Sequence, residues 1–444
     1  MLRSFGRTGD WVTPMQTNSP STSYKVPLVE IPQLVTILLS CAEDKNLRQG
    51  RHAHSYIVSH GFHVDFRVGN ALIYLYGKCG IAADAQRLFE TMSVRNLSSW
   101  NNILATYAHM GSSKQALDLF EQMQHDKFTP NRISILMVIF ACVSQTSLGD
   151  GKRIHNHILG TVFEHDVVVR TALVNMYGKC GCIDDARGTF EGSLELDVVA
   201  WNAIMSVYVQ HDLSREALSV FVQMQQQGEL PNRVSLTNAL SASATQGNKF
   251  YGKRIHVHIV CSAFQRDLIV ENALINMYGK CMDVVGALQT FDSMPLRDVI
   301  SWNALISAYA RSEKISMAHQ VFTQMHQEGV LSNSATYVIV LDTCSSPGVL
   351  PKGKHLHVSI ASYVSKSNII VENALVNMYG LCGKLDDALR FFTEMPDHNT
   401  VSFITLVSAC VDQGAVSEGT LVLAYIMESG IKIDVMLGNA SVRR

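Results

Sequence analysis

The segment VVAWNAIMSVYVQHDLSREALSVFVQMQQQG, residues 198–228, decides the fold of this chain. Its apolar residues recur at intervals of three and four in two successive stripes, as one face of an α-helix requires. The stripes are Trp201, Ile204, Met205 and Tyr208, then Ala217, Leu218, Phe221 and Met224. Ser214 can open the second helix, and Gly228 followed by Pro231 can close it. The segment therefore predicts two short helices joined by a turn.

The same pattern returns with a period of 101 residues. Trp100, Trp201 and Trp302 stand at this spacing, and each is followed by Asn. The sequence YGKC or YGLC returns at 76–79, 177–180, 278–281 and 379–382. Several independent columns that share one period indicate tandem structural repeats.

Each period divides into three related segments, which together fill residues 31–434 without a gap. The 31-residue type occupies 66–96, 167–197, 268–298 and 369–399; one 35-residue type occupies 97–131, 198–232, 299–333 and, less faithfully, 400–434; a second occupies 31–65, 132–166, 233–267 and 334–368. Each helix is too short to be stable alone, so stacking must bury its apolar face. The chain is predicted to be an all-α solenoid of about twelve helical hairpins.

The two ends of the chain fall outside this pattern. Residues 1–30 lack periodicity and are rich in Ser, Thr and Pro, which predicts disorder. Arg3 and Arg7 give this segment a weak transit-peptide character, which Asp10 opposes. Residues 435–444 resemble the start of another 31-residue segment that the chain leaves incomplete.

Composition excludes several classes of site. The net charge is −2, so any nucleic-acid binding must come from locally placed donors and cations. The ten cysteines form no Cys-x-x-Cys pair, and seven stand at repeat-equivalent positions, as small buried apolar residues in a reducing compartment would. These seven are Cys41, Cys142 and Cys344 in one column, and Cys79, Cys180, Cys281 and Cys382 in another. The longest apolar run, 135–143, is too short to span a bilayer.

No catalytic apparatus is visible in the sequence. It lacks the zinc-deaminase signature, a P-loop, a dinucleotide fingerprint and a nucleophile elbow. The histidine column His54, His155, His256 and His357 is spaced by whole periods, so its members could not share a metal ion. We expect no catalytic residue, no metal and no cofactor.

The motifs WNAIMSVYVQ, NALINMYGKC and GKRIH resemble the pentatricopeptide repeat family, and more narrowly its plant P-L-S branch. The 31-residue type is then S, the type of residues 198–232 is P, and the remaining type is L. The resemblance covers about nine tenths of the chain. It implies a right-handed superhelix that reads single-stranded RNA one base per repeat, through the fifth and the last residue, with the second residue sandwiching the base.

The resemblance assigns seven base-contacting pairs to the S and P repeats. They are Asn70 with Asn96, Asn101 with Asn131, Thr171 with Asp197, Asn202 with Asn232, Asn272 with Asp298, Asn303 with Asn333, and Asn373 with Asn399. Carboxylates only accept hydrogen bonds, which suits the ring N–H of G or U, whereas an amide both donates and accepts. The implied bases are G for Thr171, U for Asn272 and a pyrimidine for the five double-Asn repeats. The alternative is that these Asn residues are helix N-caps.

The fifth positions of the remaining repeats are mostly apolar and offer few groups that could contact a base. They are Val35, Leu136, Thr237 and Val338 in the L repeats and Ile404 in the final repeat. Only Thr237 with Asp267 could read a base in this way.

Two further columns accompany the pairs. Val168, Val199, Ile269, Ile300 and Ile370 fit the sandwiching role, or else pack between helices, while Arg67 and Ser98 depart from the pattern. Lys78, Lys179 and Lys280 could contact phosphates, or else form a solvated face.

By resemblance we expect an organellar RNA-binding specificity factor for C-to-U editing or other RNA processing, in a mitochondrion or chloroplast. An editing deaminase or an accessory editing factor supplied in trans would be its partner. The expected target, 5′ to 3′, is Y-Y-x-G-Y-x-U-Y-x-Y. The alternative is a solenoid scaffold that binds a peptide or a partner helix.

Overall fold

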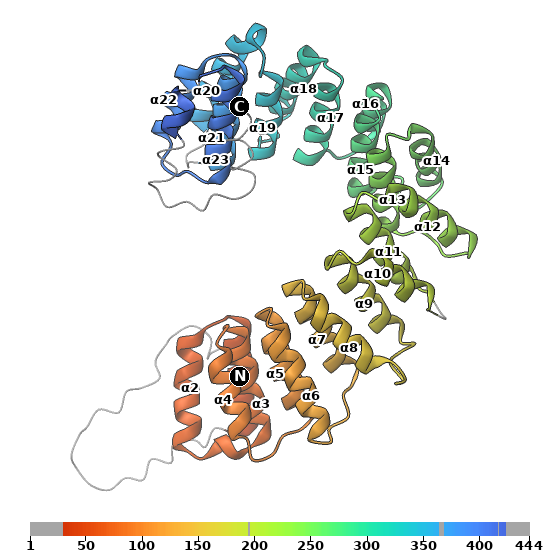
Figure 1. Cartoon of the computed structure of the whole chain (residues 1–444), viewed down its shortest axis with the longest axis vertical. Coiled ribbons are helices and arrows are strands. Elements are labelled where there is room, and N and C mark those ends of the chain that lie inside the picture. Colours follow the sequence, from red (N-terminus) through yellow and green to blue (C-terminus); the bar gives the residue numbers. More distant parts are fainter. Residues whose placement is uncertain (1–29, 194–195, 364–367, 416, 423–444) are drawn as a thin grey trace, which may run out of the picture. The chain divides into compact units, whose positions relative to one another are not determined.

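The computed structural model describes residues 30–193, 196–363, 368–415 and 417–422. Residues 1–29 of the segment expected to be disordered, and residues 435–444, lie outside these ranges. Two compact units divide the chain, residues 1–150 and 151–444. Across the described ranges the secondary structure consists of helices α1 to α23, two short 3-10 turns and a helical stretch at 417–422, with no strand (Figure 1). The fold is an α-solenoid built of helical hairpins.

The first unit holds three complete hairpins and the first helix of a fourth. Its helices are α1 (Ile31–Glu43), α2 (Leu47–Ser59), α3 (Phe66–Lys78), α4 (Ala82–Thr91), α5 (Leu97–His109), α6 (Ser113–His125) and α7 (Arg132–Gln145). Helix α8 (Leu148–Ile158) contains the division between the units. Within the unit α1, α3, α5 and α7 pack in series, each against the next.

The second unit continues the same alternation. Its helices are α9 (Val167–Lys179), α10 (Ile183–Glu191), α11 (Val198–Gln210), α12 (Ser214–Gln226), α13 (Arg233–Gln246), α14 (Lys249–Val260), α15 (Leu268–Lys280), α16 (Val284–Ser293), α17 (Val299–Arg311), α18 (Ile315–Gln327), α19 (Ser334–Thr343), α20 (Leu350–Tyr363), α21 (Ile369–Leu381), α22 (Leu385–Glu394) and α23 (Thr400–Asp412). The odd-numbered helices again pack in series. In both units every segment boundary read from the sequence coincides with the first residue of an odd-numbered helix, from Ile31 to Thr400.

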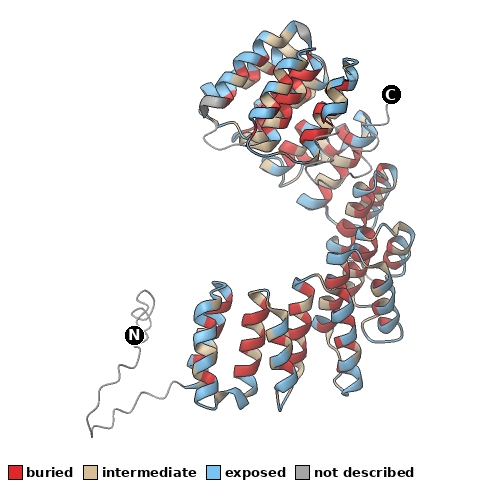
Figure 2. Ribbon diagram, turned by 60° about the vertical axis from the view of Figure 1, so that its left-hand side comes forward, coloured by how far each residue is buried: buried red, intermediate tan, exposed pale blue. Residues whose placement is uncertain are grey.

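The core lies between neighbouring helices, where Figure 2 shows the buried residues. The three repeated tryptophans, Trp100, Trp201 and Trp302, are at most 1% exposed. Each packs edge-to-face against a phenylalanine of the preceding hairpin, with ring centroids 4.7 to 5.0 Å apart. This arrangement is favourable for aromatic quadrupoles. The tryptophan column therefore joins consecutive hairpins.

The YGKC motif has a packing explanation. A Cβ at Gly178 would overlap the side chain of Val207, so glycine lets α9 and α11 approach closely. The tyrosine hydroxyl lies within 2.7 to 2.9 Å of Nδ1 of the repeated histidine in all four copies. Burial lowers the pKa of these four histidines. The histidine column thus links helices within the stack.

The described residues lack two other kinds of feature, a metal-binding cluster and a membrane-spanning helix. No three His, Cys, Asp or Glu side chains among them gather as a metal site would require. None of the described helices has the length and apolar character needed to cross a membrane.

Candidate nucleic-acid interface

Six of the seven predicted pairs are joined by a side-chain hydrogen bond. In each, Nδ2 of the fifth-position Asn donates to Oδ1 of the last-position residue. The distances are 3.2 Å for Asn70–Asn96, 3.4 Å for Asn101–Asn131, 3.0 Å for Asn202–Asn232, 3.2 Å for Asn272–Asp298, 3.3 Å for Asn303–Asn333 and 3.3 Å for Asn373–Asn399. Each pair lies where two consecutive odd-numbered helices meet. Since the odd-numbered helices pack in series, the pairs recur once per repeat along each unit.

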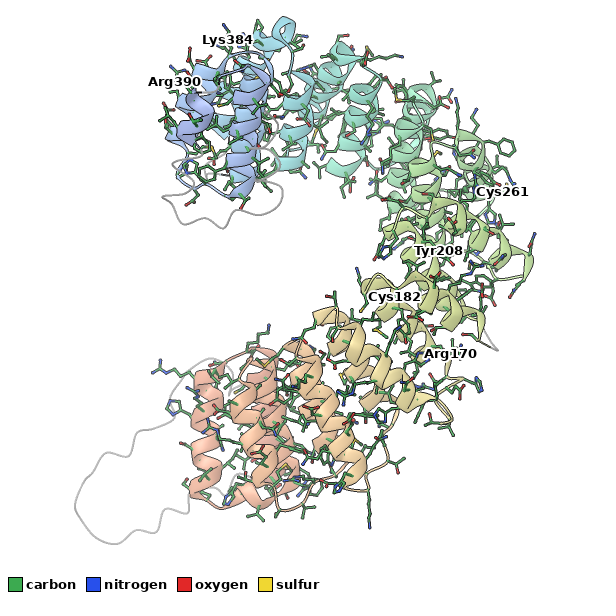
Figure 3. All side chains as sticks on the ribbon, viewed as in Figure 1. Arg170, Cys182, Tyr208, Cys261, Lys384 and Arg390 are labelled. Atoms are coloured by element: carbon green, nitrogen blue, oxygen red, sulfur yellow. The ribbon has the colours of Figure 1, made fainter. Side chains whose placement is uncertain are left out.

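The seventh pair is built differently. No hydrogen bond joins the described side chains of Thr171 and Asp197. Thr171, on α9, is 9% exposed, whereas Asp197 is exposed. The adjacent Arg170, labelled in Figure 3, donates to the carbonyl of Thr189 and to Ser193 Oγ, which holds α9 against the end of α10. Thr171 is therefore on a well-anchored helix.

Every last-position residue is also the N-cap of the next helix. Its Oδ1 accepts the backbone N–H of the third residue of the following segment, at 2.8 to 3.1 Å in all seven cases. Such caps typically contribute about 1 kcal/mol each. A last-position residue can therefore cap the next helix and also face a ligand, because the cap uses only one of its two polar side-chain atoms.

Capping fixes which atom is left over. Only an oxygen can accept the N–H, so Asn must turn Oδ1 toward the helix and Nδ2 away from it. Asp in the same place turns Oδ2 away. The last position thus offers a donor where it is Asn and an acceptor where it is Asp. This corrects the sequence-based interpretation, in which the amide was free to do both.

The charge of Asp298 is supported by its surroundings. Partial burial raises the pKa of its carboxyl, but the N–H and hydroxyl of Ser301 and the amide of Asn272 outweigh that effect. The net result is a pKa below the ordinary value, so Asp298 is an ionised acceptor at neutral pH.

Exposed aliphatic side chains lie one turn from the pairs. The second-position residues are 47 to 60% exposed, which does not fit a role purely in helix packing. They are Val168, Val199, Ile269, Ile300 and Ile370. Sequence reasoning missed three more members of this column, Ile133, Val234 and Val401, at 46 to 55% exposure. Arg67 instead forms an ion pair with Asp65 at 2.8 Å, and Ser98 is exposed.

The lysine column is at the other end of the same helices. Lys78, Lys179 and Lys280 are the last residues of α3, α9 and α15. The fifth position is eight residues earlier, which corresponds to about 12 Å along a helix. Within the described part of the chain none of the three forms an ion pair, and Lys78 Nζ lies 5.5 Å from the centroid of the Tyr74 ring. A cation here also suits the helix dipole.

The structure argues against base reading by the L-repeat pair Thr237 and Asp267. Thr237 Oγ1 donates to the carbonyl of Val234 in its own helix. Oδ1 of Asp267 caps α15 by accepting the N–H groups of Ile269 and Val270, and Oδ2 accepts Nε of Arg233 at 2.8 Å. Both oxygens of Asp267 already accept hydrogen bonds, which disfavours base reading by this pair.

Comparison with known proteins identifies the repeats. The model described as PPR repeat matches residues 98–128, 168–197, 272–299 and 373–400, and the PPR repeat family model matches 196–244 and 297–346. The chain contains pentatricopeptide repeats.

Curated relatives from Arabidopsis thaliana, named for pentatricopeptide repeats, are similar to most of this chain. Pentatricopeptide repeat-containing protein At5g27110 is 32% identical over 385 residues, which cover 87% of this chain and 56% of the relative. Pentatricopeptide repeat-containing protein At1g11290, chloroplastic, is 31% identical over 436 residues, covering 90% and 54%. Putative pentatricopeptide repeat-containing protein At3g13770, mitochondrial, is 30% identical over 378 residues, covering 84% and 60%. The chain spans 54 to 60% of the length of these relatives.

Solved structures show the same fold. The crystal structure of the pentatricopeptide repeat protein PPR10 from maize has a TM-score of 0.52 and 18% identity, covering 92% of this chain and 70% of PPR10. A structure of PPR10 in complex with an 18-nt psaJ RNA element matches with the same score and coverage.

Proposed function

We propose that the chain binds single-stranded RNA, one base for each S or P repeat. The observation that carries this proposal is the repeated pair of fifth- and last-position side chains, and we call each pair with its neighbouring second-position side chain a base pocket. Each pocket has a last-position side chain that turns one polar atom away from its helix, and in most repeats an exposed aliphatic side chain lies one turn away. Polar atoms suit the edge of a base, and an apolar side chain suits its face. The PPR10 complex supports the proposal, because it shows that a pentatricopeptide solenoid can hold RNA.

The expected target is Y-Y-x-G-Y-x-U-Y-x-Y, read with the amino terminus toward the RNA 5′ end. Asp197 and Asp298 provide the acceptors for G and U. The double-Asn pockets take a pyrimidine, and the outward Nδ2 of the capping Asn favours cytosine over uracil there. The occupied oxygens of Asp267 support an unread nucleotide at one L repeat. The lysine column would add phosphate contacts, which weaken with salt.

We further propose that the chain belongs to the P-L-S branch and directs C-to-U editing or other RNA processing, with a deaminase supplied in trans. The alternation of 31- and 35-residue segments supports this assignment. The expected compartment is a mitochondrion or chloroplast, in keeping with the names of the curated relatives.

Fluorescence anisotropy with a labelled ten-nucleotide RNA of the expected pattern tests the proposal. A scrambled RNA of the same composition and the matching DNA are the controls, all at one fixed salt concentration. We expect at least tenfold tighter binding of the expected RNA than of the scrambled one. Equal binding of both would refute base reading. Absence of binding even at low salt would favour the peptide-binding scaffold, with which the net charge of −2 is compatible.

A further inference from the structure

A buried hydroxyl accompanies every fifth-position Asn. It belongs to the third residue of the following segment: Ser99, Ser134, Ser235, Ser301, Thr336 and Ser402 follow Asn70, Asn101, Asn202, Asn272, Asn303 and Asn373. Where the fifth residue is Thr171 the third residue is Ala200, and after each of the four L repeats the third residue is Val. The six hydroxyl residues are all 0% exposed, so they act on a ligand only through other side chains.

In three pockets this hydroxyl donates to the fifth-position amide. Ser99 and Ser134 donate to Oδ1 of Asn70 and Asn101 at 2.6 Å, and Ser235 donates to Oδ1 of Asn202 at 2.7 Å. Asn202 Nδ2 donates at the same time to Oδ1 of Asn232 at 3.0 Å. Both polar atoms of the Asn202 side chain are thereby fixed in direction, with its oxygen inward.

The hydroxyls of Ser99, Ser134 and Ser235 also lie 3.0 to 3.2 Å from Oδ1 of the last-position residue, and the other three pockets keep only that second contact. Ser301, Thr336 and Ser402 donate to Oδ1 of the last-position residue at 2.9 to 3.0 Å. Oδ1 of Asn272, Asn303 and Asn373 is then buried without a hydrogen-bond partner among the described residues. The chain therefore contains double-Asn pockets with and without the bond between the hydroxyl and the fifth-position amide.

We propose that Ser99, Ser134 and Ser235 are positioning residues for base selection: each holds the oxygen of the fifth-position amide inward, so the pocket presents only N–H donors and selects cytosine over uracil. Cytosine has a bare acceptor at N3, whereas uracil has an N–H there, which donors cannot match. This inference rests on the proposed RNA-binding function.

The sequence pattern fits this role. An amide has two ends that look alike in shape but differ in hydrogen bonding, so it needs an orienting partner. Thr171 has a hydroxyl that can rotate to donate or accept, and it has no such partner in Ala200. Valine and leucine need none. A hydroxyl whose only task was to cap the next helix would not be restricted to pockets with Asn.

The test compares Ser235→Ala with Ser235→Thr and Ser402→Ala in the full chain. Binding is measured on RNAs that differ only by C or U at the nucleotide assigned to the altered repeat. Without the hydroxyl the Asn202 amide can turn over, so Ser235→Ala should lower the C-to-U binding ratio by about fivefold, the equivalent of one net hydrogen bond. Ser235→Thr restores the hydroxyl and should restore the ratio. Ser402→Ala removes the same capping-box hydroxyl without touching the fifth-position amide, and should change its own ratio less than twofold.

A readout without RNA separates this inference from the proposed function. In protein labelled with 15N-asparagine, the Asn202 side-chain amide, assigned with Asn202→Ser, should exchange faster with solvent in Ser235→Ala than in the parent. An unchanged exchange rate, or equal loss of binding to both RNAs, would overturn the inference. Failure of the parent chain to bind either RNA would instead refute the proposed function, while the exchange rate would still show whether Ser235 fixes Asn202.

Discussion

Replacing Asp197 by Asn changes one atom of the pocket between α9 and α11. The cap on Ala200, at 2.8 Å, requires an oxygen, so the introduced amide would be held with its Oδ1 on the helix just as the carboxylate is. The outward atom then changes from Oδ2, an acceptor, to Nδ2, a donor. Guanine presents N–H groups to this atom and adenine presents a bare ring nitrogen, so we expect Asp197→Asn to move the preference of this repeat from G to A.

The magnitude follows from the two roles of the side chain. As N-caps Asn and Asp are nearly equivalent, and the lost charge at the helix N-terminus costs about 0.3–1 kcal/mol. One good base contact is typically worth about 1–3 kcal/mol of discrimination. The ratio of G binding to A binding should therefore fall by about 5- to 150-fold, while the unfolding midpoint changes little.

The assay is anisotropy on two RNAs that differ only at the fourth position of the expected pattern. Asp267→Asn is the matched control, because Asp267 caps α15 in the same way but its second oxygen is taken by Arg233. It should leave every base preference unchanged. If Asp197→Asn weakens both RNAs equally, or neither, Asp197 is a cap alone and the assignment of bases to repeats is wrong.

Three other perturbations have expected outcomes. Changing Lys78, Lys179 and Lys280 together to Ala should reduce the slope of log affinity against log salt by about 2, since each phosphate contact on a single strand contributes about 0.7; an unchanged slope would show that the lysines touch no phosphate. Burial lowers the pKa of His256, so the unfolded chain takes up a proton before the folded chain as pH falls below about 6.5, and folding stability decreases there. His256→Gln should therefore make the unfolding midpoint less dependent on pH between about 7 and 5. An equally steep pH dependence would contradict this. Met282 follows its YGKC motif at the position where a glycine follows the other three YGKC or YGLC motifs. It has φ 58° and is 60% exposed, so Met282→Gly should stabilise the chain by about 1 kcal/mol in urea unfolding. Destabilisation would show that the contacts of the Met282 side chain outweigh the backbone strain.

Much of the fold was predictable because it repeats. The register of Trp100, Trp201 and Trp302 fixes where each helix lies, and the odd-numbered helices begin where the segments do. Pairing of the fifth and last residues was also accessible, since both stand at fixed places in each segment. The direction of each amide was not, because Asn reads the same in a sequence whichever way its side chain turns. That direction depends on the N–H of the next helix and on a hydroxyl three residues beyond the pair's last member.

The sequence also could not show that Asp267 is occupied. Thr237 and Asp267 have the residue types of a base-reading pair. The structure adds that Arg233, the first residue of α13, donates to Oδ2 of Asp267 and so occupies the oxygen that would face a base. The signal that could have revealed this is the basic first residue of that segment. Similarly, the exposure of Val234 and Ile133 depends on how neighbouring helices stack, which residue types alone do not determine.

Under the proposed function one side chain both caps a helix and contacts a base, which has a consequence for how such a protein can change over generations. The residues that cap helices well are few, chiefly Asn, Asp, Ser and Thr, and they differ in the hydrogen-bonding character of the group left over. A single-letter exchange between Asn and Asp can therefore alter what a repeat recognises while the helix that follows stays intact. A mutation that changes the preferred base of one repeat then costs little folding stability, and specificity can change one repeat at a time.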